Sequence, residues 1–204
     1  EYVQQFGDII KGMDARSSTF IWEKLFSLTS PRPYGADGKD GLPLPLSRAD
    51  RLQITAAIGG IDNALWDIKG KASNMPIFRL LGGEASTIPV YATGGYLKKG
   101  APITACASEL KAFIDEGYTA VKLKVGHHTM EEEVERVSAT REAIGDAMLM
   151  LDMNACYDLN ECIRFAKAVE PFNLTWLEEP LHWYLQPADF AKLSETTTIP
   201  LAHG

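Results

Sequence analysis

The sequence predicts an α/β protein, in which a helical N-terminal region precedes the first half of a (β/α)8 TIM-type barrel. Three observations support this prediction. From residue 87 onward, β-rich runs alternate with helical patterns every 25 to 32 residues, as in βα units. Glycine follows two of the predicted helices, at Gly117 and Gly145, where it commonly ends a helix. Polar residues end several predicted strands, at the edge where barrels carry their functional groups.

The N-terminal part of the chain is predicted to be mainly helical. Residues 1–30 carry apolar side chains at helical spacing. Residues 30–43 are rich in Pro, Gly and Asp, which is typical of a loop. We expect a long helix over residues 47–72, with Ser47 as its N-cap, and a short helix over residues 75–81 that ends at a glycine pair.

The long predicted helix contains two adjacent glycines, Gly59 and Gly60. Each glycine in a helix interior costs roughly 1 kcal/mol relative to Ala. We therefore expect a neighbouring element to lie close against the helix at this point.

The remaining residues, 87–204, are predicted to form four βα units and the start of a fifth strand. The predicted strands are residues 88–92, 120–125, 148–153, 174–177 and 199–202. The predicted helices are residues 104–116, 130–144, 159–169 and 188–194. Such a repeat builds either an open doubly wound sheet or a closed barrel. An open dinucleotide-binding sheet would carry G-x-G-x-x-G after its first strand, whereas residues 93–96 read Thr-Gly-Gly-Tyr, so we favour the barrel.

The composition is that of a globular protein, with 46% hydrophobic and 23% charged residues. The net charge is −7 and no basic stripe is present, so we expect no nucleic-acid partner. The acidic run at residues 131–133 is interpreted as the first turn of a helix.

No apolar stretch approaches the roughly 18 residues of a membrane helix, so we expect no membrane association. No leader is visible at Glu1, and three cysteines without C-x-x-C spacing indicate reduced thiols, so we expect a cytoplasmic protein.

Two lysines alternate along the predicted strand at residues 120–125. Because side chains alternate between the faces of a strand, Lys122 and Lys124 share one face and the apolar residues share the other. We expect the apolar face to pack against helices and the lysines to point into the barrel. Held about 7 Å apart, the two ammonium groups would lower each other's pKa, which prepares a general base. A solvated edge strand with two surface lysines is the alternative.

Polar residues also end the next two predicted strands. Asp152 and Asn154 end one strand, and Glu178 and Glu179 end the next. A single such residue is usually a cap or a turn residue. Carboxylates that end two adjacent strands would repel each other, and a hard divalent cation would remove this repulsion. The pattern therefore indicates a cation site at the edge where the lysines also lie.

These motifs and their order resemble a known family. Three segments are similar to the active-site strands of the enolase superfamily, in the branch typified by mandelate racemase and muconate-lactonising enzyme: Lys122-x-Lys124, Asp152-x-Asn154 and Trp176-Leu177-Glu178-Glu179-Pro180. Residues 60–72, followed by Leu-Leu-Gly-Gly at residues 80–83, resemble the helix that leads into that family's barrel. The resemblance extends from about residue 50 to the end of the chain.

The resemblance implies a particular domain organisation. Residues 1–86 would be the helical part of an α+β capping domain, and residues 87–204 would be the first four βα units and the start of strand five. Because a barrel needs eight strands, we expect this chain to be part of a protein of about twice its length. We also expect that protein to be a homo-oligomer.

The resemblance also implies a Mg²⁺ site. Members of this superfamily abstract the proton α to a carboxylate and stabilise the resulting enediolate on Mg²⁺. Asp152 and Glu178 match the first two metal ligands, and the third is expected just beyond Gly204. Glu179 would support these ligands without binding the metal.

Substrate contacts are implied at the same edge. Lys124 matches the base that removes the α-proton. Lys122 matches its partner, which would lower the pKa of the base and lie near the substrate carboxylate. Asn154 matches a polar residue that touches the substrate, which would be a small carboxylate such as an acid sugar or a 2-hydroxy acid.

Three functions are compatible with these residues. We expect dehydration of an acid sugar, an aldonate or aldarate, by loss of the β-hydroxyl after removal of the α-proton. The alternative within the family is racemisation or epimerisation, which depends on an opposing His–Asp pair expected on later strands. A non-catalytic binding protein on the same barrel is a more distant alternative, and the presence of both lysines and both acids argues against it.

Overall fold

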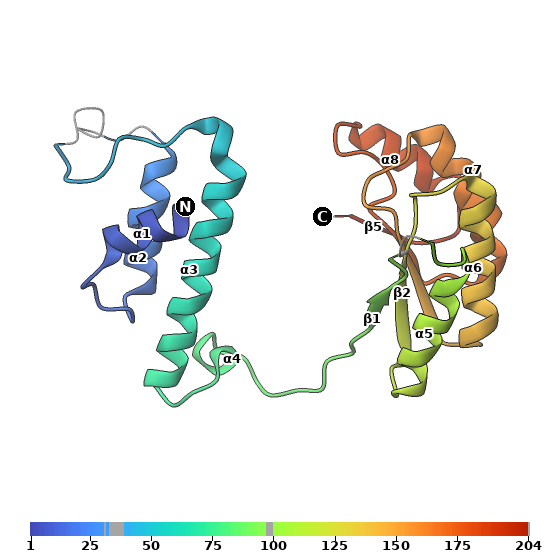
Figure 1. The fold of residues 1–204 in the computed structure, drawn as a ribbon, viewed down its shortest axis with the longest axis horizontal. Helices are drawn as coiled ribbons and strands as arrows, with labels where there is room; N and C mark the ends of the chain where they lie inside the picture. The colour runs from blue at the N-terminus through green and yellow to red at the C-terminus, as the bar shows by residue number, and fades with distance from the viewer. Residues whose placement is uncertain (31, 33–38, 97–99, 204) are drawn as a thin grey trace. The chain divides into compact units, whose positions relative to one another are not determined.

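The computed structural model describes residues 1–30, 32, 39–96 and 100–203. The chain forms two compact units, Glu1–Thr87 and Ile88–Gly204, and each is described by itself (Figure 1). Residues 31 and 33–38, which belong to the predicted loop, lie outside the described residues.

The first unit is helical. Its elements are α1 (Tyr2–Ile10), α2 (Ser18–Phe26), η1 (Ser27–Thr29), η3 (Arg48–Asp50), α3 (Arg51–Ala72) and α4 (Ile77–Leu80). Apolar side chains from α1, α2, η1 and α3 form its core, and the largest fully buried ones are Phe6, Ile21, Leu25, Leu28 and Ile54. On α3 the buried residues Ile54, Ala57, Ile58 and Leu65 follow one another at steps of three, one and seven positions, which places them on one face of the helix.

The long helix begins later than predicted. Asp50 is the N-cap of α3, and residues Arg48–Asp50 form a 3-10 turn before it. The Ser47 hydroxyl accepts a hydrogen bond from the Ala49 backbone N–H at 3.2 Å. The prediction that Ser47 caps the helix is therefore wrong, because this side chain closes the preceding turn instead.

The expectation for the glycine pair in α3 is also wrong. Both Gly59 and Gly60 are exposed. A Cβ atom built at either position would meet no atom within 4 Å in the part of the chain that the structure describes. Among the described residues of the helical unit, nothing explains why glycine stands at these two positions.

The second unit is a parallel sheet of five strands in the order β1-β2-β3-β4-β5. The strands are β1 (Ala92–Gly94), β2 (Ala120–Lys124), β3 (Met148–Asp152), β4 (Trp176–Glu178) and β5 (Leu201–Ala202). The helical elements between them are α5 (Ala105–Asp115), α6 (Met130–Ile144), α7 (Leu159–Val169), η4 (Glu170–Phe172) and α8 (Pro187–Ser194). This alternation of parallel strands and helices confirms the predicted α/β fold.

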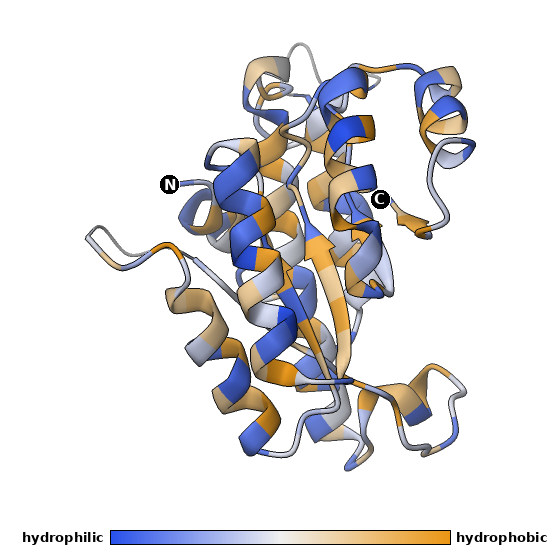
Figure 2. Ribbon diagram, turned by 90° about the vertical axis from the view of Figure 1, so that its right-hand side faces the viewer, coloured by the Kyte–Doolittle hydropathy of each residue, from blue (hydrophilic) through white to orange (hydrophobic). Residues whose placement is uncertain are grey.

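The core of the second unit lies between the sheet and its helices. Helices α5, α6 and α7 lie on the same side of the sheet (Figure 1). The apolar residues of β2 and β3 that face them, Val121, Leu123 and Leu151 among them, are fully buried. The strand arrows are mainly orange in Figure 2, as expected for buried parallel strands. The alternate residues of β2 and β3, including the two lysines, face the other side of the sheet.

The first strand lies further along the chain than predicted. Residues 88–91 precede β1, and Ile88 and Val90 are 73% and 63% exposed. The strand instead pairs Ala92 with Val121 and Gly94 with Leu123. A Cβ at Gly94 would lie 3.1 Å from the side chains of Leu110 and Phe113 on α5. The glycine therefore allows close packing of strand and helix, although its sequence context is typical of a turn.

Arg141 of α6 connects the segments that precede β3 and β4. Its guanidinium donates hydrogen bonds to the carbonyls of Gly145 and Ala147, each at 2.7 Å, and to those of Phe172 and Asn173 at 2.9 and 3.1 Å. We expect Arg141→Met to lower the free energy of unfolding by roughly 2–3 kcal/mol, because several backbone carbonyls lose a charged donor. Urea denaturation measures this loss.

The matched control for Arg141 is Arg164 on α7, which is exposed. Arg164→Met should change the free energy of unfolding by less than about 0.5 kcal/mol. Equal effects of the two substitutions would contradict the role assigned to Arg141.

Candidate active site

Four charged side chains meet at the ends of β2, β3 and β4. The Lys124 Nζ atom lies 2.6 Å from Asp152 Oδ2, and the Lys122 Nζ atom lies 3.1 Å from the same oxygen. Lys122 also donates a hydrogen bond to Glu178 Oε1 at 2.5 Å. The sequence singled out all of these residues, and the structure brings them into direct contact.

Strand register explains this convergence. Lys124 is paired with Asp152, and Asp152 is paired with Glu178, on neighbouring parallel strands. Paired residues on adjacent strands project from the same face of a sheet. Lys122, two residues before Lys124, projects from that face as well. A shift of one residue in either pairing would move one partner into the apolar core.

The charges at this edge are shielded from solvent. Lys122 is 7% exposed and Asp152 is 2% exposed. Burial alone opposes the charged form of Lys122, but its hydrogen bonds to Glu178 and Asp152 outweigh burial and raise its pKa. Burial likewise opposes the charge of Asp152, but hydrogen bonds from Lys124, the Asn154 backbone and Lys122 lower its pKa.

The raised pKa of Lys122 corrects one expectation. From the sequence, the two lysines were expected to lower each other's pKa by mutual repulsion. In the structure each ammonium group lies against a carboxylate, and the hydrogen bonds and charges of Glu178 and Asp152 raise the pKa of Lys122 despite its burial. The alternative of two solvated surface lysines is also wrong, because both side chains lie in this shielded cluster.

The residues that follow β3 and β4 place polar side chains next to the cluster. Asn154 and Glu179 adopt left-handed backbone conformations, with φ of 46° and 42°. Non-glycine residues adopt such conformations at a cost that is often found at functional sites. The Asn154 backbone N–H donates to Asp152 Oδ1, and its side-chain oxygen accepts from Lys124 Nζ, each at 3.0 Å. The Asn154 amide donates to Glu179 Oε2 at 3.5 Å.

Aromatic side chains surround the cluster, and sequence reasoning did not assign them a role. Trp176 Nε1 donates a hydrogen bond to Glu178 Oε2 at 3.0 Å. The Tyr91 ring packs edge-on against Trp176 at 5.7 Å and lies 5.3 Å from Lys122 Nζ, within cation–π range. The Tyr96 ring lies 5.9 Å from Lys124 Nζ. The strand period could have placed Trp176 beside Glu178, since they are two residues apart on β4.

The carboxylates at this edge are suitable ligands for a hard divalent cation. Asp152 and Glu178 present oxygen atoms, the ligands that Mg²⁺ prefers, from adjacent strands on the same face. Within the described residues, no three His, Cys, Asp or Glu side chains gather as a metal site. A cation held here would therefore take its other oxygen ligands from water, from substrate or from residues outside the described ranges.

The lowered pKa of Asp152 predicts a pH dependence of stability. Its ordinary value is 3.8, so the charged carboxylate stabilises the fold above about pH 4, and this contribution is lost as the pH falls through the lower folded value. In buffer without divalent cations, we expect Asp152→Asn to reduce the dependence of the unfolding free energy on pH below about pH 4. Denaturant titrations across this range provide the measurement.

Met150→Leu provides the control for this prediction. Met150 is buried on the same strand, and the substitution preserves its volume without changing a titratable group. It should change the free energy of unfolding by a similar amount at every pH, so that the dependence of this free energy on pH below about pH 4 stays as in the wild type. An unchanged acid slope in Asp152→Asn would show that this carboxylate is not stabilised in the folded state.

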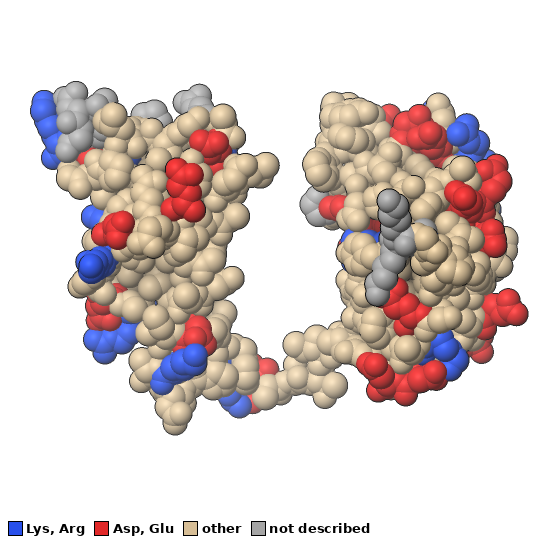
Figure 3. Space-filling model, in the orientation of Figure 1, with Lys and Arg blue, Asp and Glu red and all other residues tan. Residues whose placement is uncertain are grey.

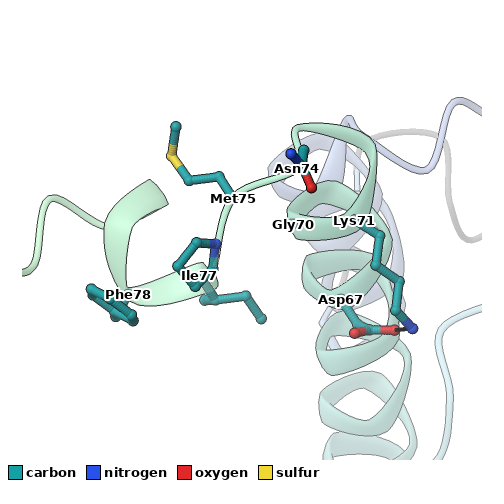
Figure 4. A pocket seen from close by; sticks show the side chains of 8 residues that line it. Asp67, Gly70, Lys71, Asn74, Met75, Ile77 and Phe78 are labelled. Carbon is teal, nitrogen blue, oxygen red and sulfur yellow. Dashed lines mark hydrogen bonds and ion pairs between the residues drawn. The ribbon is translucent and has the colours of Figure 1, made fainter. Parts of the chain in front are cut away.

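A separate surface groove lies in the helical unit. Its volume is about 590 Å³, and it lies between the end of α3 and α4. Figure 4 shows the residues that line it, with the Lys71–Asp67 ion pair at one side and Met75, Ile77 and Phe78 at the other. None of the residues at the ends of β2, β3 and β4 lines this groove.

The surface charge is mixed. Figure 3 shows Asp and Glu side chains distributed over the visible face of each unit, with Lys and Arg between them rather than in one broad patch. Of the helices in the described ranges, none has the length and apolar character needed to cross a membrane.

Two family models match the chain. The model described as the N-terminal domain of mandelate racemase / muconate lactonizing enzyme matches residues 44–82. The model described as enolase C-terminal domain-like matches residues 105–204, which include every lysine and carboxylate of the cluster.

Individual proteins resemble the chain over most of its length. The arabinonate dehydratase of Saccharolobus solfataricus is 31% identical over 185 residues, which are 90% of this chain and 45% of that enzyme. The crystal structure of the 3,6-anhydro-D-galactonate cycloisomerase from Zobellia galactanivorans is 31% identical with a TM-score of 0.75, and covers 100% of this chain and 52% of the other.

A third relative was solved with ligands. The L-talarate dehydratase from Polaromonas sp. JS666, complexed with Mg and L-glucarate, is 31% identical with a TM-score of 0.73. The similarity covers 100% of this chain and 52% of that one. This chain therefore spans about half the length of the relatives that it matches.

Proposed function

Because the chain belongs to the mandelate racemase and muconate-lactonising branch of the enolase superfamily, we propose that the protein is an acid-sugar dehydratase. It would convert an aldonate or aldarate into a 2-keto-3-deoxy acid. The observation that carries this proposal is the convergence of two lysines and two carboxylates at the ends of three adjacent strands. The similarity to a dehydratase solved with Mg and L-glucarate supports it.

Lys124 would act as the base. Its Nζ atom lies at the rim of the cluster, hydrogen-bonded to Asp152 and Asn154. To accept a proton it must first be neutral, and Asp152 then provides an acceptor that orients the amine. The proton on the α-carbon passes to Nζ, and the electron pair of the broken C–H bond moves into the carboxylate, which becomes an enediolate. Contacts that strengthen as this charge develops accelerate the reaction.

The second half of the reaction is an elimination. The enediolate electrons return toward carbon, and the bond between the β-carbon and its hydroxyl breaks. The departing hydroxide takes up one proton from solvent, which balances the proton held by Lys124, and leaves as water; the resulting enol tautomerises to the 2-keto acid. Lys122 would support both halves, because its raised pKa favours the charged ammonium, which stabilises the added negative charge of the substrate carboxylate.

Asp152 and Glu178 would hold Mg²⁺. When bound, the cation supplies positive charge that offsets the two negative charges of the enediolate. Glu178 is oriented for this role by the hydrogen bond from Trp176. Asp152 is oriented by the Asn154 backbone N–H, which occupies its second oxygen. Glu179 reaches the cluster through Asn154 and supports its position.

A second candidate function is cycloisomerisation, favoured by the similarity to a cycloisomerase over the whole chain. If the β-oxygen belongs to a ring ether, the same elimination opens the ring and the oxygen stays in the molecule. The product is then an isomer of the substrate rather than a dehydrated acid.

Incubation of the full-length protein with Mg²⁺ and a panel of aldonic, aldaric and anhydro-aldonic acids tests these functions. Keto-acid formation with loss of water supports the dehydratase, and keto-acid formation without loss of water supports the cycloisomerase. In D₂O, deuterium at the α-carbon without a keto acid would indicate a racemase or epimerase instead. No reaction with any member of a broad panel would contradict the proposed catalysis and favour a binding protein.

We also propose that the protein works in the cytoplasm as a homo-oligomer on a small carboxylate. The free, buried thiols of Cys106 and Cys162 support a reducing compartment. Light scattering of the purified protein measures the oligomeric state, and a monomer would contradict this part of the proposal.

A further inference from the structure

Helix α6 carries a buried ion pair that the proposed reaction does not use. Glu133 is fully buried and Arg136 is 1% exposed. The Arg136 Nη1 atom donates to Glu133 Oε2 at 2.7 Å. Burying two charges is costly even when they are paired, and apolar residues of similar volume often give equal or greater stability. Stabilisation of the fold is therefore a poor explanation for this ion pair. The other hydrogen bonds of the two side chains indicate what the pair does.

Glu133 holds the loop that follows β2. Its second oxygen, Oε1, accepts hydrogen bonds from three consecutive backbone N–H groups, those of Gly126, His127 and His128, at 2.8, 2.9 and 3.1 Å. Hydrogen bonds to a charged acceptor are about twice as strong as neutral ones. This loop begins directly after the end of β2, the strand that carries Lys124.

Arg136 holds the loop that follows β1. Its Nη2 atom donates to the Gly95 carbonyl at 2.6 Å, while the Gly95 N–H donates to Glu109 of α5 at 3.1 Å. Gly95 has a φ of +87°, and a Cβ there would lie 2.2 Å from the Leu123 side chain and 3.4 Å from the Lys124 backbone nitrogen. The loop backbone therefore packs directly on the residue proposed as the base.

From these contacts we infer that Glu133 and Arg136 are positioning residues for Lys124, an inference that rests on the proposed function. Together they form a clamp that fixes the backbone on both sides of the base. Gly95, held by Arg136, lies against the Lys124 backbone, and Gly126, held by Glu133, follows two residues later. The clamp also fixes the residue after Gly95, Tyr96, whose ring lies near Lys124 Nζ.

Arg141 offers a matched control on the same helix. It also binds several backbone carbonyls, but these belong to the segments that precede β3 and β4, at the opposite end of the strands from Lys124. Lysine at either position keeps the positive charge, but it loses the hydrogen bonds that the guanidinium donates from different nitrogen atoms to different partners. Both substitutions should therefore destabilise the fold, whereas only the one at Arg136 should disturb the position of Lys124.

The test compares the kinetics of Arg136→Lys and Arg141→Lys in the full-length protein. Each variant is assayed at a temperature well below its own midpoint of thermal unfolding. We expect Arg136→Lys to lower kcat on the order of 10²-fold, as small misplacements of a reacting group do, with little change in KM. Arg141→Lys should keep kcat near the wild-type value. Equal losses of kcat in the two variants, or a loss in Arg136→Lys confined to KM, would overturn the inference.

Backbone amide exchange provides a readout that does not depend on activity. In Glu133→Gln, the amides of residues 126–128 should exchange faster than in the wild type, and Arg141→Lys should leave them unchanged. Unchanged exchange in Glu133→Gln would overturn the clamp even if the enzyme is active. If the wild type transforms no acid sugar but these amides respond as expected, the proposed function fails and the clamp on the loops stands.

Discussion

Lys124→Ala is expected to lower the rate of α-proton exchange from an acid-sugar substrate on the order of 10³- to 10⁴-fold, the upper range for loss of a general base. The substrate should still bind, because Lys122 and the other polar residues of the cluster remain in place. Nuclear magnetic resonance in D₂O measures the exchange, and calorimetric titration measures binding.

Two further variants make this prediction specific. Lys124→Arg keeps the positive charge but should fail almost as badly as Lys124→Ala, because a guanidinium does not release its proton at working pH and so cannot act as a base. Lys111→Ala removes an exposed lysine that forms an ion pair with Asp115 and should leave exchange unchanged. Exchange at the wild-type rate in Lys124→Ala would place the base elsewhere.

Asp152→Asn should abolish detectable keto-acid formation and weaken Mg²⁺ binding. The carboxylate lies between both ammonium groups and is nearly inaccessible to solvent. Asparagine has the same shape but no charge, so it is a poor ligand for a hard cation and no longer pairs with the lysines. Isothermal titration with Mg²⁺ measures the loss of affinity, and circular dichroism verifies the fold.

The control for this substitution is Asp115→Asn, on the exposed side of α5. It should change neither Mg²⁺ affinity nor activity. A fully active Asp152→Asn, or one that binds Mg²⁺ as tightly as the wild type, would refute the assignment of Asp152 as a metal ligand.

Much of the fold could be predicted because local signals were strong. The bounds of α6 and α7 agree with the predicted ranges, and both helices begin with a capping box, Thr129 with Glu132 and Asp158 with Glu161. The position of β1 was missed because Gly94 is used for close packing against α5 rather than for a turn. Such a use depends on tertiary contacts that no local pattern contains.

The sequence could predict which residues form the site, but not which of them contact one another. The period of two along each strand identified which side chains share a face. It could not show that each lysine is paired with a carboxylate, because this depends on the register between strands. The acidic run does form the first turn of α6, as predicted, but the buried role of Glu133 within that run was missed. Its spacing from Arg136 and Val137, both buried on α6, was the signal that could have revealed it.

The most direct test of the proposed chemistry follows the α-hydrogen itself. The full-length protein is given an aldonate or aldarate deuterated at the α-carbon, in ordinary water, with Mg²⁺ or with a chelator. We expect deuterium to appear in the solvent in step with keto-acid formation, and only when Mg²⁺ is present. Formation of a keto acid that retains the deuterium, or equal release in the chelator, would contradict proton abstraction at this magnesium-dependent site.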